Sequence, residues 1–200
     1  ASFSPQRFIG YLFVLFLLPV FQLMGIMGVF ALITLFTLGS IALMIFKGHQ
    51  IFRSVISTIF CMVYPIMPLS FLLFLKYLQP YLLGTIALST VFVSAWTTDT
   101  FAYFTGITLG KHKICPMISP KKTIEGSIGG LLGSIIVSSI LGLMFEYYLY
   151  SGIQWFHYSI IGILGGIFAQ IGDLSASAVK RYAGIKDFSG FFPGHGGMLD

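Results

Sequence analysis

A run of 39 residues without a charged side chain, from Phe8 to Phe46, constrains this chain more than any other feature. A bilayer core of about 30 Å takes roughly 20 helical residues to cross, so the run is too long for one span and long enough for two. Gly25 offers a turn inside it, which predicts helices over residues 8–24 and 27–46. Uncharged runs of this length indicate a protein embedded in a membrane.

The composition excludes the main soluble classes of protein. Only 8% of the residues are charged, whereas a soluble domain usually has about 25%, and the mean hydropathy is +0.94. The two cysteines, Cys61 and Cys115, are too few for a disulfide scaffold, and the 21 phenylalanines exclude intrinsic disorder. We therefore predict an all-α, multi-pass membrane helical bundle without a nucleic-acid partner.

Further uncharged or apolar stretches predict four more helices, over residues 54–75, 81–109, 123–145 and 156–182. Pro65 and Pro68 are expected to kink the first of these. Small residues at Gly126, Gly130 and Gly133 would let another helix approach closely. A β-barrel is the rival architecture, but its strands alternate between apolar and polar residues and these runs do not. We expect about six helices in a single membrane-embedded domain, with three spans in residues 1–80.

Basic residues divide unequally between the two faces that six crossings create. Ten fall on one face and one on the other, a bias that places the ten on the cytoplasmic side and predicts that both chain ends are cytoplasmic. The eleventh is Lys76, and the ten are Arg7, Lys47, Arg53, Lys111, Lys113, Lys121, Lys122, Lys180, Arg181 and Lys186.

Two acidic residues, Asp99 and Asp173, are expected inside helices near the cytoplasmic boundary. Acids inside a membrane are costly, so they indicate function, although each could instead reach the interface or pair with a lysine. Counted from the outer helix ends, both lie at one depth, about 25 Å in. Asp173 also belongs to a polar stripe on one helical face, which needs water or a ligand beside it. The stripe is Gln170, Asp173, Ser177, Lys180 and Arg181.

Residues 119–126 place Lys121 and Lys122 directly before a helix that Ser119 or Thr123 could cap. Two ammonium groups beside the positive end of a helix suit a polyphosphate. The same lysines could instead simply anchor the chain at the cytoplasmic face. Residues 119–126 alone leave both interpretations open.

The last 14 residues combine acidic side chains with a tight, glycine-rich turn. Carboxylates with no cysteine and little histidine suit a hard cation such as Mg²⁺, and not zinc. Glycines around the histidine would let the backbone approach a ligand closely. The residues concerned are Asp187, His195, Gly196, Gly197 and Asp200.

Residues 177–200 resemble the signature of the phosphatidate cytidylyltransferases, also called CDP-diacylglycerol synthases. The signature reads S-x-x-K-R-x4-K-D-x5-P-G-H-G-G-x-x-D-R-x-D, and the chain follows it from Ser177 to Asp200. Asp173 with its neighbours, residues 119–126, and Asp99 look like other landmarks of that family. Since the family continues beyond this point with Arg-x-Asp and a last helix, and has further leading helices, we expect the chain to be a fragment.

The resemblance implies transfer of CMP from CTP to phosphatidate, giving CDP-diacylglycerol and pyrophosphate for phospholipid biosynthesis. It implies that Asp173 and Asp200 carry an essential Mg²⁺. Our further hypothesis gives the CTP phosphates to Lys121 and Lys122. The other candidates are Lys180, Arg181 and Lys186 for the lipid phosphate or pyrophosphate, Asp187 for orienting a cation, His195, Gly196 and Gly197 against a phosphate, and Ser119, Asp99 and Ser177 for substrate binding.

Two other functions remain as alternatives. A CTP-dependent lipid alcohol kinase is built from similar parts, and a transporter also uses acids inside a membrane, although the outer side offers only Lys76 and Glu146. The expected partners are CTP, phosphatidate and membrane lipid, and the expected location is a bacterial inner membrane with the active site facing the cytoplasm. The sequence leaves open a homodimer and a monovalent cation at the site.

Overall fold

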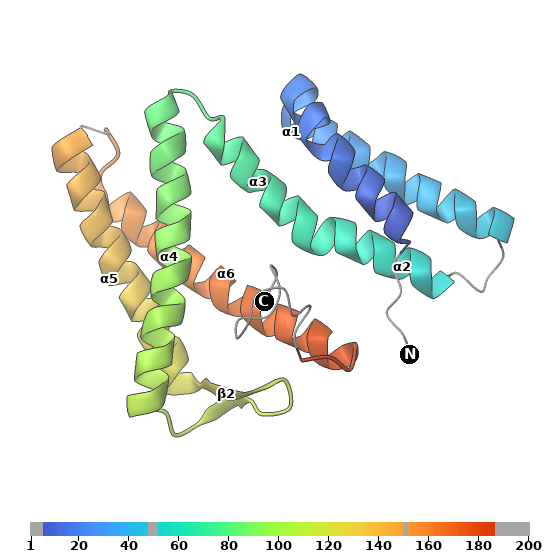
Figure 1. The fold of residues 1–200 in the computed structure, drawn as a ribbon. Coiled ribbons are helices and arrows are strands. Elements are labelled where there is room, and N and C mark those ends of the chain that lie inside the picture. Colours follow the sequence, from blue (N-terminus) through green and yellow to red (C-terminus); the bar gives the residue numbers. More distant parts are fainter. Residues whose placement is uncertain (1–5, 48–51, 150–151, 187–200) are drawn as a thin grey trace. The chain divides into compact units, whose positions relative to one another are not determined.

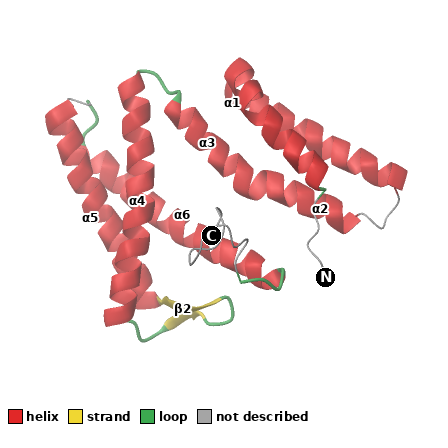
Figure 2. Ribbon diagram, viewed as in Figure 1, coloured by secondary structure: helices red, strands yellow, loops and turns green. Residues whose placement is uncertain are grey.

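The computed structural model describes residues 6–47, 52–149 and 152–186. These residues are almost entirely helical, apart from one two-stranded antiparallel sheet (Figures 1 and 2). Five helical segments are long and apolar enough to cross a membrane. The expected all-helical, multi-pass architecture is therefore confirmed. The chain divides into two compact units, Ala1–Tyr81 and Leu82–Asp200, which are described separately.

In the first unit, helix α1 (Arg7–Lys47) is broken at Gly25, where φ is 61° and ψ is −149°. A side chain would strain this backbone, so glycine permits the break. The rings of Phe13 and Phe36 lie 5.5 Å apart although 23 positions separate them, so the two arms of α1 lie side by side (Figure 1). The two helices expected here are thus confirmed as two arms that meet at the kink, and together they count as one of the five long apolar helical segments.

The rest of the first unit is a helix interrupted by a wider turn. It runs through α2 (Phe52–Cys61), the π-helical η2 (Met62–Ile66) and α3 (Met67–Lys76). Pro65 lies inside η2 and supplies no N–H for the regular hydrogen-bond pattern, which accounts for the irregular turn there. The buried apolar cluster of this unit consists of Ile9, Phe13, Leu32 and Met62.

The second unit contains three long helices, α4 (Tyr81–Thr108), α5 (Ile124–Leu149) and α6 (Trp155–Tyr182). Their bounds lie within a few residues of those expected from the sequence. Between α4 and α5, strands β1 (Lys113–Cys115) and β2 (Ser119–Thr123) form a hairpin, where the sequence predicted only a loop (Figure 2).

Small residues hold α4, α5 and α6 together. A Cβ added at Gly130 of α5 would lie 2.6 Å from the carbonyl oxygen of Thr98 in α4, and one added at Gly162 of α6 would lie 2.9 Å from that of Ser134. The Ser134 hydroxyl lies 3.2 Å from the carbonyl oxygen of Ser94 and 2.9 Å from that of Gly162. The close helix approach expected from the glycine spacing is confirmed. Close packing of the helix backbones therefore holds this unit together in place of a large core of apolar side chains.

The outer faces of these helices are apolar. Phe104 of α4, Ile128 of α5 and Phe168 of α6 are 61%, 56% and 67% exposed. Large apolar side chains at such exposure suit contact with lipid and not with water. The polar residues described below lie at one end of this apolar surface.

Candidate functional site

The hairpin between α4 and α5 positions the two lysines of residues 119–126. A turn closes it, with the N–H of Ile118 donating to the carbonyl oxygen of Cys115 over 3.1 Å. At its base, the N–H of Ile124 donates to the carbonyl oxygen of His112 over 2.9 Å. Lys121 and Lys122 are neighbours on β2, so their side chains leave opposite faces of the strand.

The start of α5 is capped from within the hairpin. The N–H of Gly126 donates to Oγ1 of Thr123 over 3.1 Å. Of the two caps that the sequence offered, Thr123 is therefore the one used, because Ser119 lies further back, paired with Cys115 across the hairpin. The capped end places the N-terminus of α5 next to the lysines.

Glu125, in the first turn of α5, fastens the chain that leaves α4. Its Oε2 accepts the N–H of Lys111 over 3.0 Å and that of His112 over 3.2 Å. Its Oε1 lies 2.6 Å from Nδ1 of His112. Sequence reasoning assigned no role to Glu125. An acidic residue in a first helical turn was the available signal.

The central contact of the site joins β2 to α6. Lys122 Nζ forms an ion pair with Oδ2 of Asp173, and the two side chains are 28% and 45% exposed. Asp99 of α4 interacts electrostatically with both residues. Three elements that are distant in sequence therefore bring two carboxylates and one ammonium group near one another. This proximity agrees with the expectation that Asp99 and Asp173 lie at the same depth in the membrane.

The polar stripe of α6 meets protein groups along its length. The amide Nε2 of Gln170 donates to the carbonyl oxygen of Ser127 over 3.2 Å, and its Oε1 accepts from the Ser127 hydroxyl. The Nε of Arg181 donates to the carbonyl oxygen of Ile118 over 3.3 Å. The hydrogen bonds show that α5 and the hairpin supply part of the stripe's partners, and the expectation of water or a ligand beside it stays a prediction. Ser177 is half-buried between these contacts.

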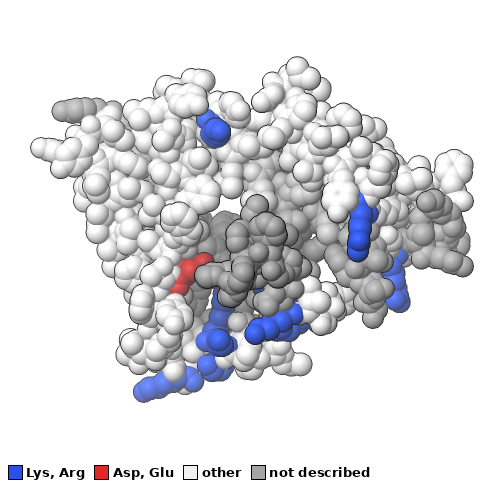
Figure 3. All heavy atoms as spheres, viewed as in Figure 1, with Lys and Arg blue, Asp and Glu red and all other residues white. Residues whose placement is uncertain are grey.

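The end of α6 presents its basic residues beside the hairpin. Gly184 adopts a φ of 72°, and the N–H of Ile185 donates to the carbonyl oxygen of Lys180 over 3.0 Å, which closes the helix. Lys186 is exposed just beyond. In Figure 3 the basic side chains of this unit gather around the hairpin and this helix end, next to an acidic side chain. This end of the bundle is therefore rich in positive charge, with an acidic side chain beside the basic ones (Figure 3).

Part of the predicted site lies outside the described residues. Within the described residues, no group of three or more His, Cys, Asp or Glu side chains is placed to hold a metal ion. Asp99 and Asp173 nevertheless fit Mg²⁺, which proteins usually bind through one or two carboxylates together with substrate phosphates. The predicted residues outside the described ranges are Asp187, His195, Gly196, Gly197 and Asp200.

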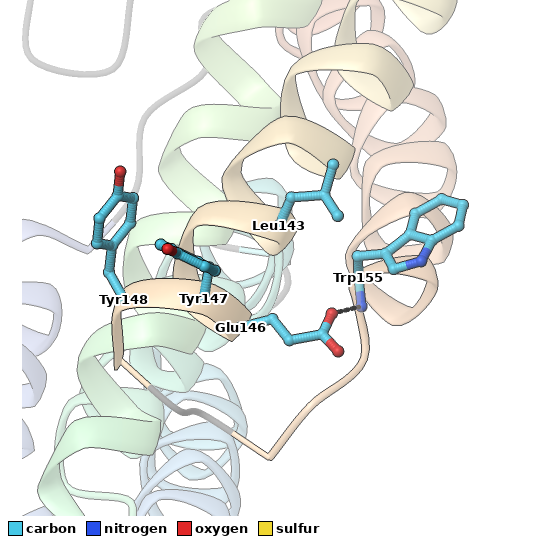
Figure 4. A pocket seen from close by; sticks show the side chains of 5 residues that line it. All are labelled: Leu143, Glu146, Tyr147, Tyr148 and Trp155. Carbon is cyan, nitrogen blue, oxygen red and sulfur yellow. Dashed lines mark hydrogen bonds between the residues drawn. The ribbon is translucent and has the colours of Figure 1, made fainter.

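An open pocket lies at the opposite end of α5, away from the hairpin (Figure 4). Its volume is about 600 Å³. Within it, Oε2 of Glu146 accepts a hydrogen bond from the backbone N–H of Trp155 over 3.0 Å. Aromatic side chains at a helix end are typical of a membrane–water interface. Its lining residues are Leu143, Glu146, Tyr147, Tyr148 and Trp155. Because α5 separates it from Lys122, this pocket is not part of the candidate site.

Comparison with known proteins decides the family. A sequence model described as the cytidylyltransferase family matches residues 2–200. The chain belongs to the cytidylyltransferase family. The resemblance read from residues 177–200 is thereby confirmed.

Curated relatives of this family share more than two fifths of the residues in the matched segment. A phosphatidate cytidylyltransferase of Staphylococcus saprophyticus is 44% identical over 109 residues, which cover 54% of this chain and 40% of the relative. One of Bacillus subtilis is 42% identical over 108 residues, covering 54% and 39%. One of Staphylococcus aureus is 45% identical over 109 residues, covering 54% and 40%. The chain thus spans about two fifths of the length of the curated relatives it matches.

Proposed function

We propose that this chain carries the catalytic part of a phosphatidate cytidylyltransferase, which transfers CMP from CTP to phosphatidate and releases pyrophosphate. The observation that carries the proposal is the cluster of Asp99, Asp173 and Lys122, set among basic residues at one end of an apolar helical bundle. At such a boundary a water-soluble nucleotide and the phosphate of a lipid can meet. Family membership and the activity named for the curated relatives support it.

The reaction needs little covalent chemistry from the protein. A phosphate oxygen of phosphatidate is already an anionic nucleophile, so no side chain has to deprotonate it. This oxygen forms a bond to the α-phosphorus of CTP, the bond from that phosphorus to the oxygen bridging to the β-phosphate breaks, and pyrophosphate leaves with the bridging oxygen. The work of the protein is to hold two polyanions in line and to offset their charge.

Basic residues on two elements suit those two polyanions. Lys121 and Lys122 on β2 would bind the phosphates of CTP, next to the capped end of α5. Lys180, Arg181 and Lys186 at the end of α6 would bind the lipid phosphate or the leaving pyrophosphate. The contact of Arg181 with Ile118 keeps the two groups of cations close. Ser119 and Ser177 stay candidates for substrate contacts.

We include Mg²⁺ in the proposal, held by Asp173 together with Asp200, with Asp99 near the same place. When bound there, the ion supplies neutralising charge to the phosphates. A monovalent cation at the same site stays open. Asp187 would orient a cation, and the turn of His195, Gly196 and Gly197 would lie against a phosphate.

The charge bias of the sequence supports a site on the cytoplasmic side, where CTP is available. A bacterial inner membrane stays the proposed location. The product would serve phospholipid synthesis. A homodimer stays an open proposal.

The test is to incubate the purified protein in phosphatidate vesicles with labelled CTP, with and without Mg²⁺. The proposal predicts labelled CDP-diacylglycerol and pyrophosphate with Mg²⁺ and neither product after chelation. Formation of a phosphorylated lipid with release of CDP would instead identify a lipid kinase. Absence of any CTP turnover would contradict both enzymes.

A further inference from the structure

The carboxylate of Asp173 already has a partner of opposite charge from the protein itself. Lys122 Nζ lies on Oδ2 of Asp173, and Asp99 interacts with both groups. The three residues come from β2, α6 and α4, so no short-range sequence relation brings them together. The ammonium group of Lys122 offsets the negative charge of Asp173, which a bound metal ion would otherwise offset.

The ion pair between Lys122 and Asp173 can also dissociate easily. Asp173 is 45% exposed and Lys122 28%, and ion pairs at such exposure contribute little to stability. Lysine carries a compact charge on a flexible stem, so its ammonium group can move several ångströms without movement of the strand. Lys122 lies next to the N-terminus of α5, where an anion would be held as well. The ammonium group of Lys122 can therefore move from Asp173 to an anion held at the N-terminus of α5.

We propose that Lys122 is an internal counter-ion for Asp173, which takes the place of Mg²⁺ in the nucleotide-free protein and leaves it for the CTP phosphates when metal and nucleotide bind. The inference rests on the proposed function, which assigns Mg²⁺ and CTP to this site. It makes Lys122 a positioning residue that couples the two ligands. Metal alone must compete with the ammonium group, whereas CTP offers that group a new partner.

Coupling of this kind is reciprocal, so each ligand strengthens binding of the other. Without CTP, the ammonium group of Lys122 weakens metal binding by competition and by repulsion between like charges. Removing that charge should strengthen metal binding without nucleotide. The same change should reduce the gain in metal affinity that CTP produces. This pair of opposite effects distinguishes a counter-ion from a residue that only stabilises the fold.

The experiment titrates the detergent-solubilised protein with Mn²⁺, as a substitute for Mg²⁺, and follows free Mn²⁺ by electron paramagnetic resonance. The variants are Lys122→Met, Lys122→Arg and a matched control, Lys121→Met. Lys121 is exposed on the same strand and forms no ion pair within the described ranges. Lys121→Met therefore removes the same charge from the protein without opening Asp173.

Without nucleotide, we expect Lys122→Met to bind Mn²⁺ about tenfold more tightly than the unchanged protein. Lys121→Met should stay within about twofold of the unchanged protein because its charge is screened. Lys122→Arg keeps the charge and should bind Mn²⁺ as the unchanged protein does. With CTP present, the affinity of the unchanged protein should rise, and that of Lys122→Met should rise less.

Equal Mn²⁺ affinity of Lys122→Met and the unchanged protein, with both binding the ion, would overturn the inference and leave the proposed function intact. An equal gain from Lys121→Met would also overturn it, because net charge alone would then explain the effect. No Mn²⁺ binding to any variant, with or without CTP, would contradict the metal-dependent function itself. Loss of fold in Lys122→Met is checked by gel filtration. If it occurs, Lys122→Gln, which also removes the charge but keeps a polar side chain, is titrated in its place, and an Mn²⁺ affinity equal to that of the unchanged protein overturns the inference.

Discussion

At the scale of single residues, the site depends on side chains that position other side chains. Lys122 acts on Asp173 directly, whereas Glu125 acts from a distance by fixing the chain that leads into the hairpin. Its carboxylate accepts two backbone N–H groups and contacts the His112 ring. Charge-assisted hydrogen bonds of this kind are stronger than neutral ones, so Glu125 should order the base of the hairpin.

We predict that Glu125→Gln loosens this connection without unfolding the helices. The amide side chain keeps one acceptor oxygen but loses the negative charge and the second acceptor. Amide hydrogen exchange at Lys111 and His112 should become roughly fivefold faster, while exchange in the middle of α5 stays unchanged. The measurement is hydrogen–deuterium exchange followed by mass spectrometry. Unchanged protection at both residues would mean that Glu125 does not fasten the hairpin.

The sequence analysis allowed Asp173 to pair with a lysine, and the ion pair confirms that alternative, but the sequence did not show that the partner is Lys122. Each of the two residues stood out by its type and place, Asp173 as an acid in an apolar helix and Lys122 beside a helix start. Their contact depends on how the hairpin folds back toward α6, which is a property of the tertiary structure. Asp200 was selected as an acidic residue in the glycine-rich tail and by the family resemblance, and its contact with Asp173 remains a prediction outside the described residues.

At the scale of elements, helices were predicted well because charges and prolines mark their ends in a chain that is otherwise apolar. The hairpin was missed because its strands have three and five residues, too few for an alternating pattern. The turn at Pro116 was a usable signal, since proline favours the second position of a turn. The bend at Gly25 was predicted correctly, but a bent helix and two helices look alike in sequence.

We predict that Gly130→Ala destabilises the second unit. Its new methyl group would meet the backbone of Thr98, which cannot rotate away as a side chain can. The free energy of unfolding should fall by about 1–3 kcal/mol. Gly39→Ala is the matched control, because a Cβ there has nothing within 4 Å and alanine favours a helix. Circular dichroism during unfolding of the protein in detergent measures both, and equal stability of the two variants would refute the packing account.

At the scale of the whole molecule, the apolar helices and the basic end of the second unit predict how the protein is oriented in the membrane. α5 separates the hairpin at its N-terminus from Tyr147 and Tyr148 near its C-terminus. The basic residues lie with the hairpin, and aromatic residues and Glu146 lie at the other end. The positive-inside bias then predicts that the candidate site faces the cytoplasm.

This orientation predicts the labelling of two introduced cysteines, in a variant whose two natural cysteines are replaced by serine. Met117→Cys, at the 93% exposed tip of the hairpin, should react with a membrane-impermeant maleimide only after right-side-out vesicles are opened. Tyr148→Cys, at a position that is 69% exposed, should react in sealed vesicles. The reverse pattern would place the site outside the cytoplasm, where CTP is absent.

The central claim is that Asp173 is essential to transfer of CMP from CTP to phosphatidate. The most direct test measures Mg²⁺-dependent formation of CDP-diacylglycerol by Asp173→Asn, with Ser175→Ala as the control on the same helix. The account predicts a loss of at least about 100-fold for Asp173→Asn, with membrane insertion unchanged. Ser175→Ala should keep full activity, because within the described residues that hydroxyl donates to the backbone of Ile171. Normal turnover by Asp173→Asn would contradict the account.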